Sequence, residues 1–330
     1  MKSYVRVFAT LGMIAACPGY AQELMWTDAG SALHAMVASA SNGENPPNAE
    51  GVISHPLDTS EAVHSEPSLA SAWFARSDAA KEAQPHWMTP IVTVTPRLEQ
   101  EYRYDQLWQS KPGGVNLTND GLNKGLELIP TLNSEIILGV PGYQVTTNAP
   151  NFRKVPGAGV QGWNDETFLY KYRLLSANEE NGNYIVTGFM GLSVPTGDAP
   201  LSSGHYAFTP TLAAGKGWGN RDEGFDIQST LAITVPDRDM AQLGEPIVWN
   251  TAFQGHLWRY WWPEFETQYT HFAGGINNGK NQIVLTPGLV LGRYEWIDRL
   301  HFVIGLGYQK AVGGFQTFNN GWQMTVRTPF

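Results

Sequence analysis

Charged side chains stand at alternate positions in several stretches of this chain. In "RLEQEYR" (97–103) arginine and glutamate alternate with other residues, and Lys171 and Arg173 repeat the spacing. Because successive side chains of a β-strand point to opposite faces, this spacing places the charges of each stretch on one face. The charged candidates are Arg97, Glu99, Glu101, Arg103, Glu127, Glu135, Lys171, Arg173, Asp226, Glu264, Glu266 and Arg327.

A charged face of this kind has two uses in a closed sheet. The charges could line a passage and filter or guide a solute. Alternatively, opposite charges on adjacent strands neutralise one another and fill a narrow interior. Both interpretations stay open at the level of sequence.

The chain carries little that is typical of an enzyme. The motifs G-x-S-x-G and H-E-x-x-H are absent, and "AGKGWG" (214–219) lacks the spacing of a phosphate-binding loop. His256 and His271 could serve as bases, but neither has a recognisable serine partner. Cys17 is the only cysteine, and cleavage after residue 21 would remove it. We therefore predict no catalytic, cofactor or metal site.

The elements that must position the charges are strands. From Pro90 onward, stretches of alternating apolar and polar residues are separated by turn-forming residues, and Leu300 to Gln309 is among the clearest. About twelve such stretches are long enough to cross a bilayer at a tilt. Their predicted starts lie near residues 91, 122, 134, 163, 183, 204, 223, 246, 261, 281, 298 and 319.

Three features favour a membrane barrel over a soluble β-sandwich. Charges occur mid-strand on one face while the other face carries almost none, as a wet lumen and a lipid belt require. Trp and Tyr gather near strand ends, as in Trp258 and Tyr260 around one turn, which is typical of an interfacial girdle. The third feature is the low content of charged residues, which make up only 15% of the chain. As a separate point, the net charge of -9 argues against a nucleic-acid partner. Residues 89–330 are therefore predicted to form an all-β, transmembrane antiparallel β-barrel.

The first 88 residues have a different character. Residues 1–21 combine a basic start, an apolar stretch and small residues before Gln22, which predicts a secretory signal peptide. "IAAC" (14–17) also resembles a lipoprotein box, in which Cys17 would be acylated. Residues 22–88 are rich in Ser, Pro, Asn and Ala, and we interpret them as a flexible periplasmic segment. Short helices at 31–40 and 68–79 would instead suit a plug or a partner-docking element.

The chain ends on an alternating stretch, "WQMTVRTPF" (322–330), with Trp322 and Phe330 on its apolar face. This pattern resembles the C-terminal signal by which the assembly machinery recognises bacterial outer-membrane proteins. "LELIPTLNSEIILGVPGY" (126–143), "GFMGLSVPTGD" (188–198) and "TPTLAAGKGWGNRDEGFDIQSTLAITVP" (209–236) are similar to phrases of the outer-membrane family of putative phenol-degradation meta-pathway proteins. The resemblance covers roughly residues 90–330 and implies transport of hydrophobic or aromatic compounds.

Taken together, the residues and the resemblance predict a channel or transporter for small molecules. It would lie in the outer membrane of a Gram-negative bacterium, in contact with lipid, a solute and the assembly machinery. Two alternatives remain. One is a structural or adhesive barrel that binds partners through extracellular loops, and the other is an outer-membrane hydrolase.

Overall fold

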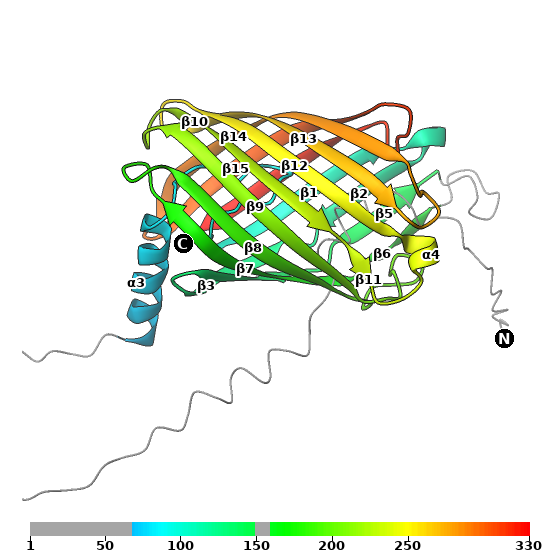
Figure 1. The fold of residues 1–330 in the computed structure, drawn as a ribbon, viewed down its shortest axis with the longest axis horizontal. Coiled ribbons are helices and arrows are strands. Elements are labelled where there is room, and N and C mark those ends of the chain that lie inside the picture. Colours follow the sequence, from blue (N-terminus) through cyan, green and yellow to red (C-terminus); the bar gives the residue numbers. More distant parts are fainter. Residues whose placement is uncertain (1–67, 149–158) are drawn as a thin grey trace, which may run out of the picture.

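The chain folds into a closed antiparallel β-barrel (Figure 1). The computed structural model describes residues 68–148 and 159–330. Each wall strand pairs with its neighbours, and the sheet closes where β1 pairs with β16, from Glu101 opposite Pro329 to Ser110 opposite Asn320. In a bilayer this closure matters, because a lipid-exposed sheet edge would leave main-chain polar groups without partners.

The described elements run from α3 to β16. In chain order they are α3 (Leu69–Glu82), β1 (Glu101–Ser110), η2 (Pro112–Gly114), β2 (Asn116–Gly121), β3 (Gly125–Thr131), β4 (Ser134–Gly139), β5 (Tyr143–Thr147), β6 (Val160–Trp163), β7 (Glu166–Ala177), β8 (Tyr184–Val194), β9 (Ala207–Gly219), β10 (Gly224–Ile233), β11 (Val235–Pro236), α4 (Met240–Leu243), β12 (Glu245–His256), β13 (Trp261–Ala273), β14 (Asn281–Ile297), β15 (Leu300–Val312) and β16 (Asn320–Pro329).

Twelve strands form the wall, as the sequence predicts. Three of them are interrupted, so β2 and β3, β4 and β5, and β6 and β7 are each two halves of one strand. Asn123 bridges the interruption. Its side chain accepts a hydrogen bond from the main-chain N–H of Gly142 (2.6 Å) and donates one to the carbonyl of Asp165 (3.1 Å). The breaks are therefore joined by side-chain hydrogen bonds.

The two faces of the sheet differ as alternation predicts. In β9 and β10 the outward residues Phe208, Leu212 and Leu231 are exposed, while their inward neighbours Thr209 and Thr230 are buried. The same pattern holds around the wall, so the apolar face points out and the buried residues line the interior. Among residues 68–148 and 159–330, no helix is both long enough and apolar enough to cross a bilayer.

The first wall strand begins later than predicted. The strand expected near residue 91 is absent, and β1 starts at Glu101. Val92 and Leu98, expected on the lipid face, are instead buried in the interior. Pro90 and Pro96 lack the N–H that a central strand must donate, which explains why this alternating stretch does not join the sheet. Most of the chain between the predicted starts near 91 and 122 instead belongs to β1 and β2.

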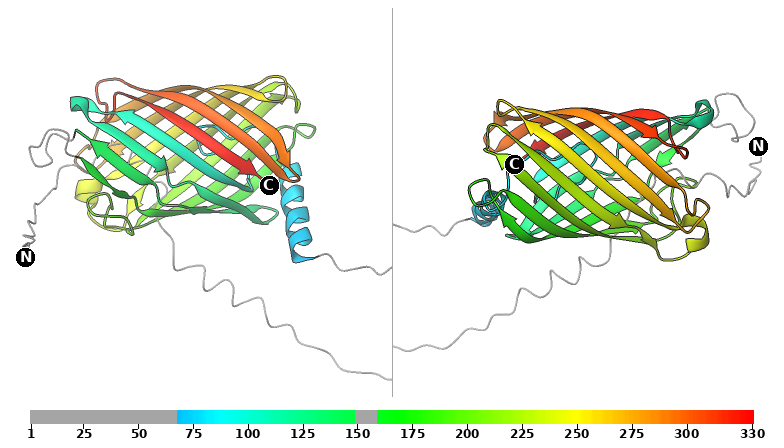
Figure 2. Two further views of the ribbon diagram at one scale, coloured as in Figure 1. Left: turned by 180° about the vertical axis from the view of Figure 1, so that it is seen from behind. Right: turned by 45° about the horizontal axis from the view of Figure 1, so that its top comes forward.

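The structure describes the last part of the chain before the barrel. Residues 1–67, with the predicted signal peptide, Cys17 and most of the predicted flexible segment, lie outside the described residues. Within that segment, residues 69–82 form α3, and the side-chain hydroxyl of Ser68 caps the helix by accepting the N–H of Ser71. Helix α3 lies at the end of the barrel where the chain terminates (Figures 1 and 2). We call this end the α3 end.

Candidate functional site in the barrel lumen

A stretch of the chain fills part of the barrel interior. Residues 83–100, which we call the lumen segment, leave α3, enter the lumen and return to the α3 end, where β1 begins. The two ends of its loop are joined, because the side-chain amide of Gln84 donates to the carbonyl of Leu98 (2.8 Å) and accepts its N–H (2.9 Å). Met88, Ile91 and Leu98 are almost completely buried. Residues 83–100 are therefore packed inside the barrel.

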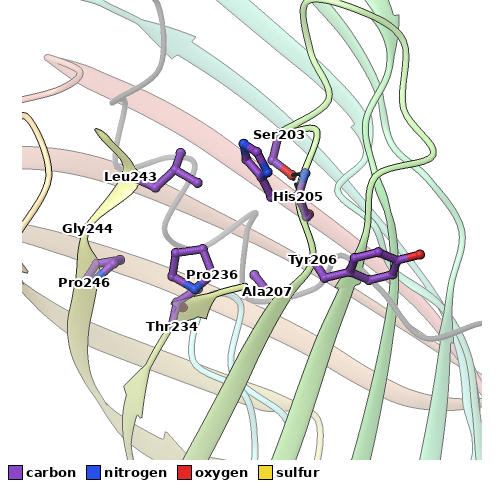
Figure 3. Close-up of a pocket in the computed structure, with 9 residues that line it drawn as sticks. All are labelled: Ser203, His205, Tyr206, Ala207, Thr234, Pro236, Leu243, Gly244 and Pro246. Atoms are coloured by element: carbon purple, nitrogen blue, oxygen red, sulfur yellow. Dashed lines mark hydrogen bonds between the residues drawn. The ribbon is translucent and has the colours of Figure 1, made fainter. Parts of the chain in front are cut away.

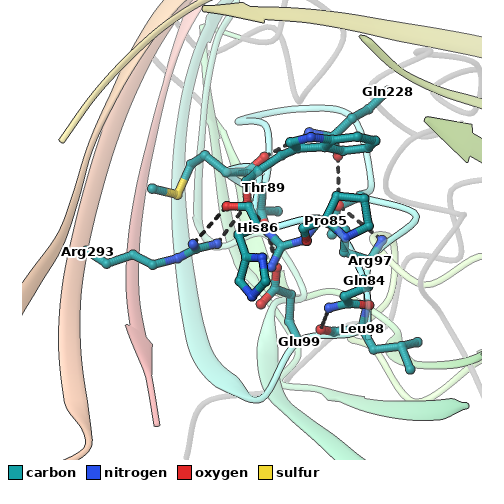
Figure 4. Close-up of polar contacts among 12 residues, drawn as sticks. Gln84, Pro85, His86, Thr89, Arg97, Leu98, Glu99, Gln228 and Arg293 are labelled. Carbon is teal, nitrogen blue, oxygen red and sulfur yellow. Dashed lines mark hydrogen bonds and ion pairs between the residues drawn. The ribbon is translucent and has the colours of Figure 1, made fainter. Parts of the chain in front are cut away.

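Arginine side chains of the wall hold the carbonyls of the lumen segment. The Arg293 guanidinium on β14 donates to the carbonyls of His86 (2.9 Å) and Trp87 (2.7 Å), as Figure 4 shows. Arg327 on β16 donates likewise to the carbonyls of Thr89 (2.5 Å) and Pro90 (2.7 Å). A planar guanidinium offers several parallel donors, so each arginine fixes two successive peptide units.

Further donors hold the deeper part of the segment. On β1, Arg103 donates to the carbonyl of Ile91 (2.7 Å), which also accepts from the Gln323 amide (3.0 Å). The Gln228 amide on β10 donates to the carbonyl of Met88 (2.9 Å). The carbonyls of residues 86–91 are therefore all bonded to side chains of the wall.

Carboxylates of the wall hold the N–H groups. Glu266 on β13 accepts from Val92 (2.7 Å) through one oxygen and from Thr93 (2.5 Å) through the other. The neighbouring Glu264 accepts from Ile91 (3.1 Å). Two carboxyl groups of one wall strand therefore bind three successive N–H groups of the segment.

The remaining charged candidates pair with one another or with the ends of the segment. Lys171 on β7 and Glu135 on β4 form an ion pair of 2.9 Å, and Arg103 pairs with Asp105 at 2.7 Å. Arg173 donates to the carbonyl of Ala80 at the end of α3 (2.6 Å). Three further carboxylates, Glu101, Glu127 and Asp226, are buried in the wall. Some charges thus pair with one another while others bind the lumen segment, and the filtering of a solute stays a prediction.

Arg97 and Glu99 lie on the lumen segment itself. The sequence predicts them on a wall strand, but they precede β1. They form an ion pair of 2.8 Å, and the Arg97 side chain donates to the carbonyl of Pro85 (2.6 Å) and to that of Trp87 (Figure 4). The Glu99 carboxylate also accepts from the Thr89 hydroxyl (3.1 Å). These bonds brace the two arms of the loop against each other.

Glycines of the wall make room for two large side chains of the segment. A Cβ at Gly215 would lie 2.5 Å from the Trp87 ring, and one at Gly217 would also clash with that ring. A Cβ at Gly288 would lie 2.8 Å from Cδ1 of Ile91. The wall is therefore shaped around Trp87 and Ile91, because any larger residue at these positions would displace them.

The sequence does not predict several of the residues that contact the lumen segment. Arg293 lies where β14 passes a bulge, between Gly292 and Tyr294, so the period of two does not assign it to a face. Glu179 lies in a turn, where no strand pattern applies. The inward glycines do not by themselves predict a lumen segment, because small inward residues also suit an ordinary barrel wall.

Glu179 anchors the segment at the α3 end. Its carboxylate accepts the main-chain N–H of His86 (2.6 Å) and contacts the His86 ring at 2.9 Å. Burial raises the pKa of Glu179, but its hydrogen bonds with His86 outweigh burial and lower the pKa to about 2. The carboxylate is therefore ionised at neutral pH and holds the entrance of the segment. On α3, burial lowers the pKa of Lys81, which donates to the main-chain oxygen of Phe330 (2.8 Å).

Beyond the tip of the segment the interior carries few charges. Thr230, Asn250 and Gln268 lie side by side on three neighbouring strands and are all buried. Within the described part of the chain, the hydroxyl of Thr230, the amide oxygen of Asn250 and the amide nitrogen of Gln268 have no hydrogen-bond partner. An apolar strip lies next to them, and it packs against Val94 of the segment. The strip consists of Ile137, Leu169, Phe189, Ala213 and Ala232.

A small pocket lies outside the lumen, where β9, β11 and β12 meet (Figure 3). Its volume of about 20 Å³ is enough for a single water molecule. His205 lines it, and the Nε2 atom of this ring lies 2.9 Å from the Asp239 carboxylate. A pocket of this size cannot hold an organic substrate.

The two candidate histidines lie apart from any serine contact. His256 faces inward, as predicted, and its ring stacks on Trp262 with centroids 3.6 Å apart. His271 contacts the Asn281 amide oxygen at 2.7 Å. Among the described residues, no group of three His, Cys, Asp or Glu side chains could hold a metal ion.

The residues of the predicted assembly signal lie near the closing seam. Trp322 is half exposed on the outer face, and its ring centroid is 5.0 Å from that of Tyr308. The N–H of Phe330 donates to the carbonyl of Gln100 (3.0 Å), which ties the last residue to the start of β1.

A closed antiparallel barrel of twelve strands with an apolar outer face defines an outer-membrane β-barrel protein of the Gram-negative type. No family model matches this chain, and no curated protein matches it. The predicted phenol-degradation family therefore stays a prediction.

Several solved outer-membrane proteins are similar to the chain. An outer membrane channel from Pseudomonas putida F1 is 13% identical, with a TM-score of 0.45, over 70% of this chain and 95% of that chain. The transport unit of the autotransporter AIDA-I from Escherichia coli is 11% identical, with a TM-score of 0.39, over 78% and 97%. OmpF of Salmonella typhi, solved with daunomycin, is 8% identical, with a TM-score of 0.32, over 70% and 96%.

Proposed function

We propose that this protein is a gated channel of the outer membrane, with the α3 end facing the periplasm and residues 83–100 as the gate. One observation carries the proposal. The lumen is filled by a separate stretch of chain, for which wall glycines make room, and only partly by side chains of the wall. A barrel with a purely structural role could be filled by its own inward side chains.

The path of the segment allows it to leave the lumen. It enters and returns through the α3 end, so it can withdraw as a loop without passing its end through the barrel. Withdrawal would expose Arg293, Arg327 and Glu266 without their main-chain partners. Because these hydrogen bonds to charged groups would all be lost on withdrawal, we expect the closed state to be the resting state.

The interior beyond the segment suits a small solute with an apolar body and one hydrogen-bonding group. The apolar strip around Phe189 offers a surface for the body, and the unpartnered atoms of Thr230, Asn250 and Gln268 offer hydrogen bonds. This combination agrees with the hydrophobic or aromatic solutes that the family resemblance implies. Trp322 and Phe330 remain proposed contacts of the assembly machinery.

Excision of the gate tests the proposal. Because Gln84 and Leu98 are bonded to each other, residues 85–97 can be replaced by two glycines with little strain on α3 or β1. We expect the excised variant to conduct steadily in planar bilayers, while the full chain is mostly closed. A folded variant that stays closed would exclude a channel. Replacing Phe189 with Ala in the excised variant should weaken block of the current by phenol, and an unchanged block would argue against the proposed solute class.

A further inference from the structure

The wall of the lumen recognises the lumen segment mainly through its main chain. Over residues 86–93 the wall binds the carbonyls of six successive residues and the N–H groups of His86, Ile91, Val92 and Thr93. Main-chain groups are the same in every polypeptide. A site built on them can therefore accept other sequences that take the same extended path.

The recognition has a repeating design. Arg293 bridges the carbonyls of residues 86 and 87, Arg327 bridges those of 89 and 90, and Glu266 bridges the N–H groups of 92 and 93. Each of the three charged groups thus binds two successive peptide units. In the ion pairs formed by the described residues, neither arginine has a carboxylate partner, so the segment supplies their main acceptors.

Four side chains of the segment, Trp87, Met88, Ile91 and Val92, belong to a buried apolar cluster, and two of them fit against wall glycines. Trp87 packs over Gly215 and Gly217, and its indole N–H donates to the Asn183 amide (2.8 Å). Four residues later, Ile91 packs over Gly288. A replacement for the segment must therefore carry an aromatic residue and a branched apolar residue four positions apart.

We propose that the α3-end half of the lumen is a peptide-binding site, which residues 86–93 occupy as a built-in ligand. The external ligand would be a linear peptide of about eight residues in extended form, entering from the α3 end, with large apolar residues at its second and sixth positions. In the intact chain it competes with a tethered segment, whose effective concentration is about millimolar. This proposal concerns binding and is independent of whether the barrel conducts.

The test is binding of labelled peptides to the excised variant that lacks residues 85–97, measured by fluorescence anisotropy. The first probe is the native peptide of residues 85–97. The second keeps the buried apolar residues Trp87, Met88, Ile91 and Val92 and the prolines in place but permutes the other residues. The third is the native peptide with methyl groups on the amide nitrogens of the residues equivalent to Val92 and Thr93, which removes the donors to Glu266.

We expect the permuted peptide to bind within about fivefold of the native peptide, and the methylated peptide to bind at least about tenfold more weakly. Loss of binding by the permuted peptide alone would show recognition of side chains and would overturn the proposal. Absence of binding by the native peptide would overturn it as well. Conductance of the same variant is recorded separately, so a failed channel and a failed binding site give different results.

The full chain provides a second test if the excised variant does not fold. A cysteine at Thr93, in a chain without Cys17, reports withdrawal of the segment through its rate of maleimide labelling. Met88→Leu keeps the main chain and the buried apolar volume at this position, and labelling should stay within about threefold of the parent rate. Glu266→Gln should increase the rate about tenfold or more. The opposite ranking would overturn main-chain recognition.

Discussion

Replacement of Arg327 by Ala is the most direct test of how the lumen segment is held. Arg327 is almost completely buried and donates to the carbonyls of Thr89 (2.5 Å) and Pro90 (2.7 Å). Hydrogen bonds to charged groups contribute about 1.5–3 kcal/mol each, so the gross loss is about 3–6 kcal/mol. Removing a buried guanidinium also removes its desolvation cost, which leaves about 2–3 kcal/mol against the closed state.

A change of this size is large for a gate. Since each 1.4 kcal/mol is a factor of ten, the ratio of open to closed channels should rise about 30- to 140-fold. The measurement is the open fraction of single channels of purified protein in planar bilayers. Arg327→Lys keeps the charge but not the fork of donors, so its open fraction should lie between those of the parent and Arg327→Ala.

The matched control is Arg238→Ala, which removes an exposed arginine at the opposite end of the barrel, where it pairs with Asp237 at 3.1 Å. We expect its open fraction to equal that of the parent. Folding of each variant is checked by the heat-dependent shift in its electrophoretic mobility. If Arg327→Ala is folded and opens no more often than Arg238→Ala, these bonds do not hold the gate closed.

Three further perturbations probe the fit of the segment, the lipid face and the entrance anchor. Gly215→Val should push the Trp87 ring aside and open the channel. Gly188→Val is the control and should not open it, because a Cβ at Gly188 meets nothing within 4 Å. Equal open fractions of the two variants would contradict the fit of Trp87 to the wall. Ile304→Arg, on the outer face, should lower the free energy of unfolding by about 2–4 kcal/mol, measured by urea titration in lipid vesicles. Gln309→Arg, on the inner face, should lower it less. Equal costs would mean that the faces are assigned wrongly. Because the pKa of Glu179 lies at about 2, below the ordinary value of 4.5, its stabilising contribution is complete above pH 4.5 and is lost as the pH falls toward 2. Proteolysis of the segment should therefore accelerate modestly over that pH range, because the carboxylate is half buried. Glu179→Gln should remove the acceleration. A variant with the same pH dependence as the parent would assign the acceleration to another group.

Much of the fold could be predicted from the sequence because a strand in a barrel wall is a local pattern. Alternation over about ten residues sets which face is apolar, and the turn residues between stretches set the count of twelve. The predicted starts near 134, 223 and 261 agree closely with β4, β10 and β13 for this reason. Inward placement of Glu264, Glu266 and Arg327 also follows from the period of two.

The partners of these charges could not be predicted, because they come from a distant part of the chain. Glu266 binds the N–H of Val92, 174 residues away, and Arg327 binds the carbonyl of Pro90, 237 residues away. No spacing in the sequence encodes such contacts. Arg293 was missed for a different reason, since a bulge in β14 breaks the alternation on which the prediction depends.

Sequence by itself determined the class of fold, the face on which each strand carries its charges and the change of character before residue 90. Only the tertiary structure decided that residues 91–100 leave the wall and enter the lumen. The physical reason is that an extended stretch with alternating apolar residues looks the same whether it pairs in a sheet or lies inside one. The outcome depends on which groups form hydrogen bonds with its main chain. Pro90 and Pro96 lack the N–H donors of a strand. Side chains of the closed barrel supply partners for the segment instead, namely Glu264, Glu266, Arg103 and Arg327.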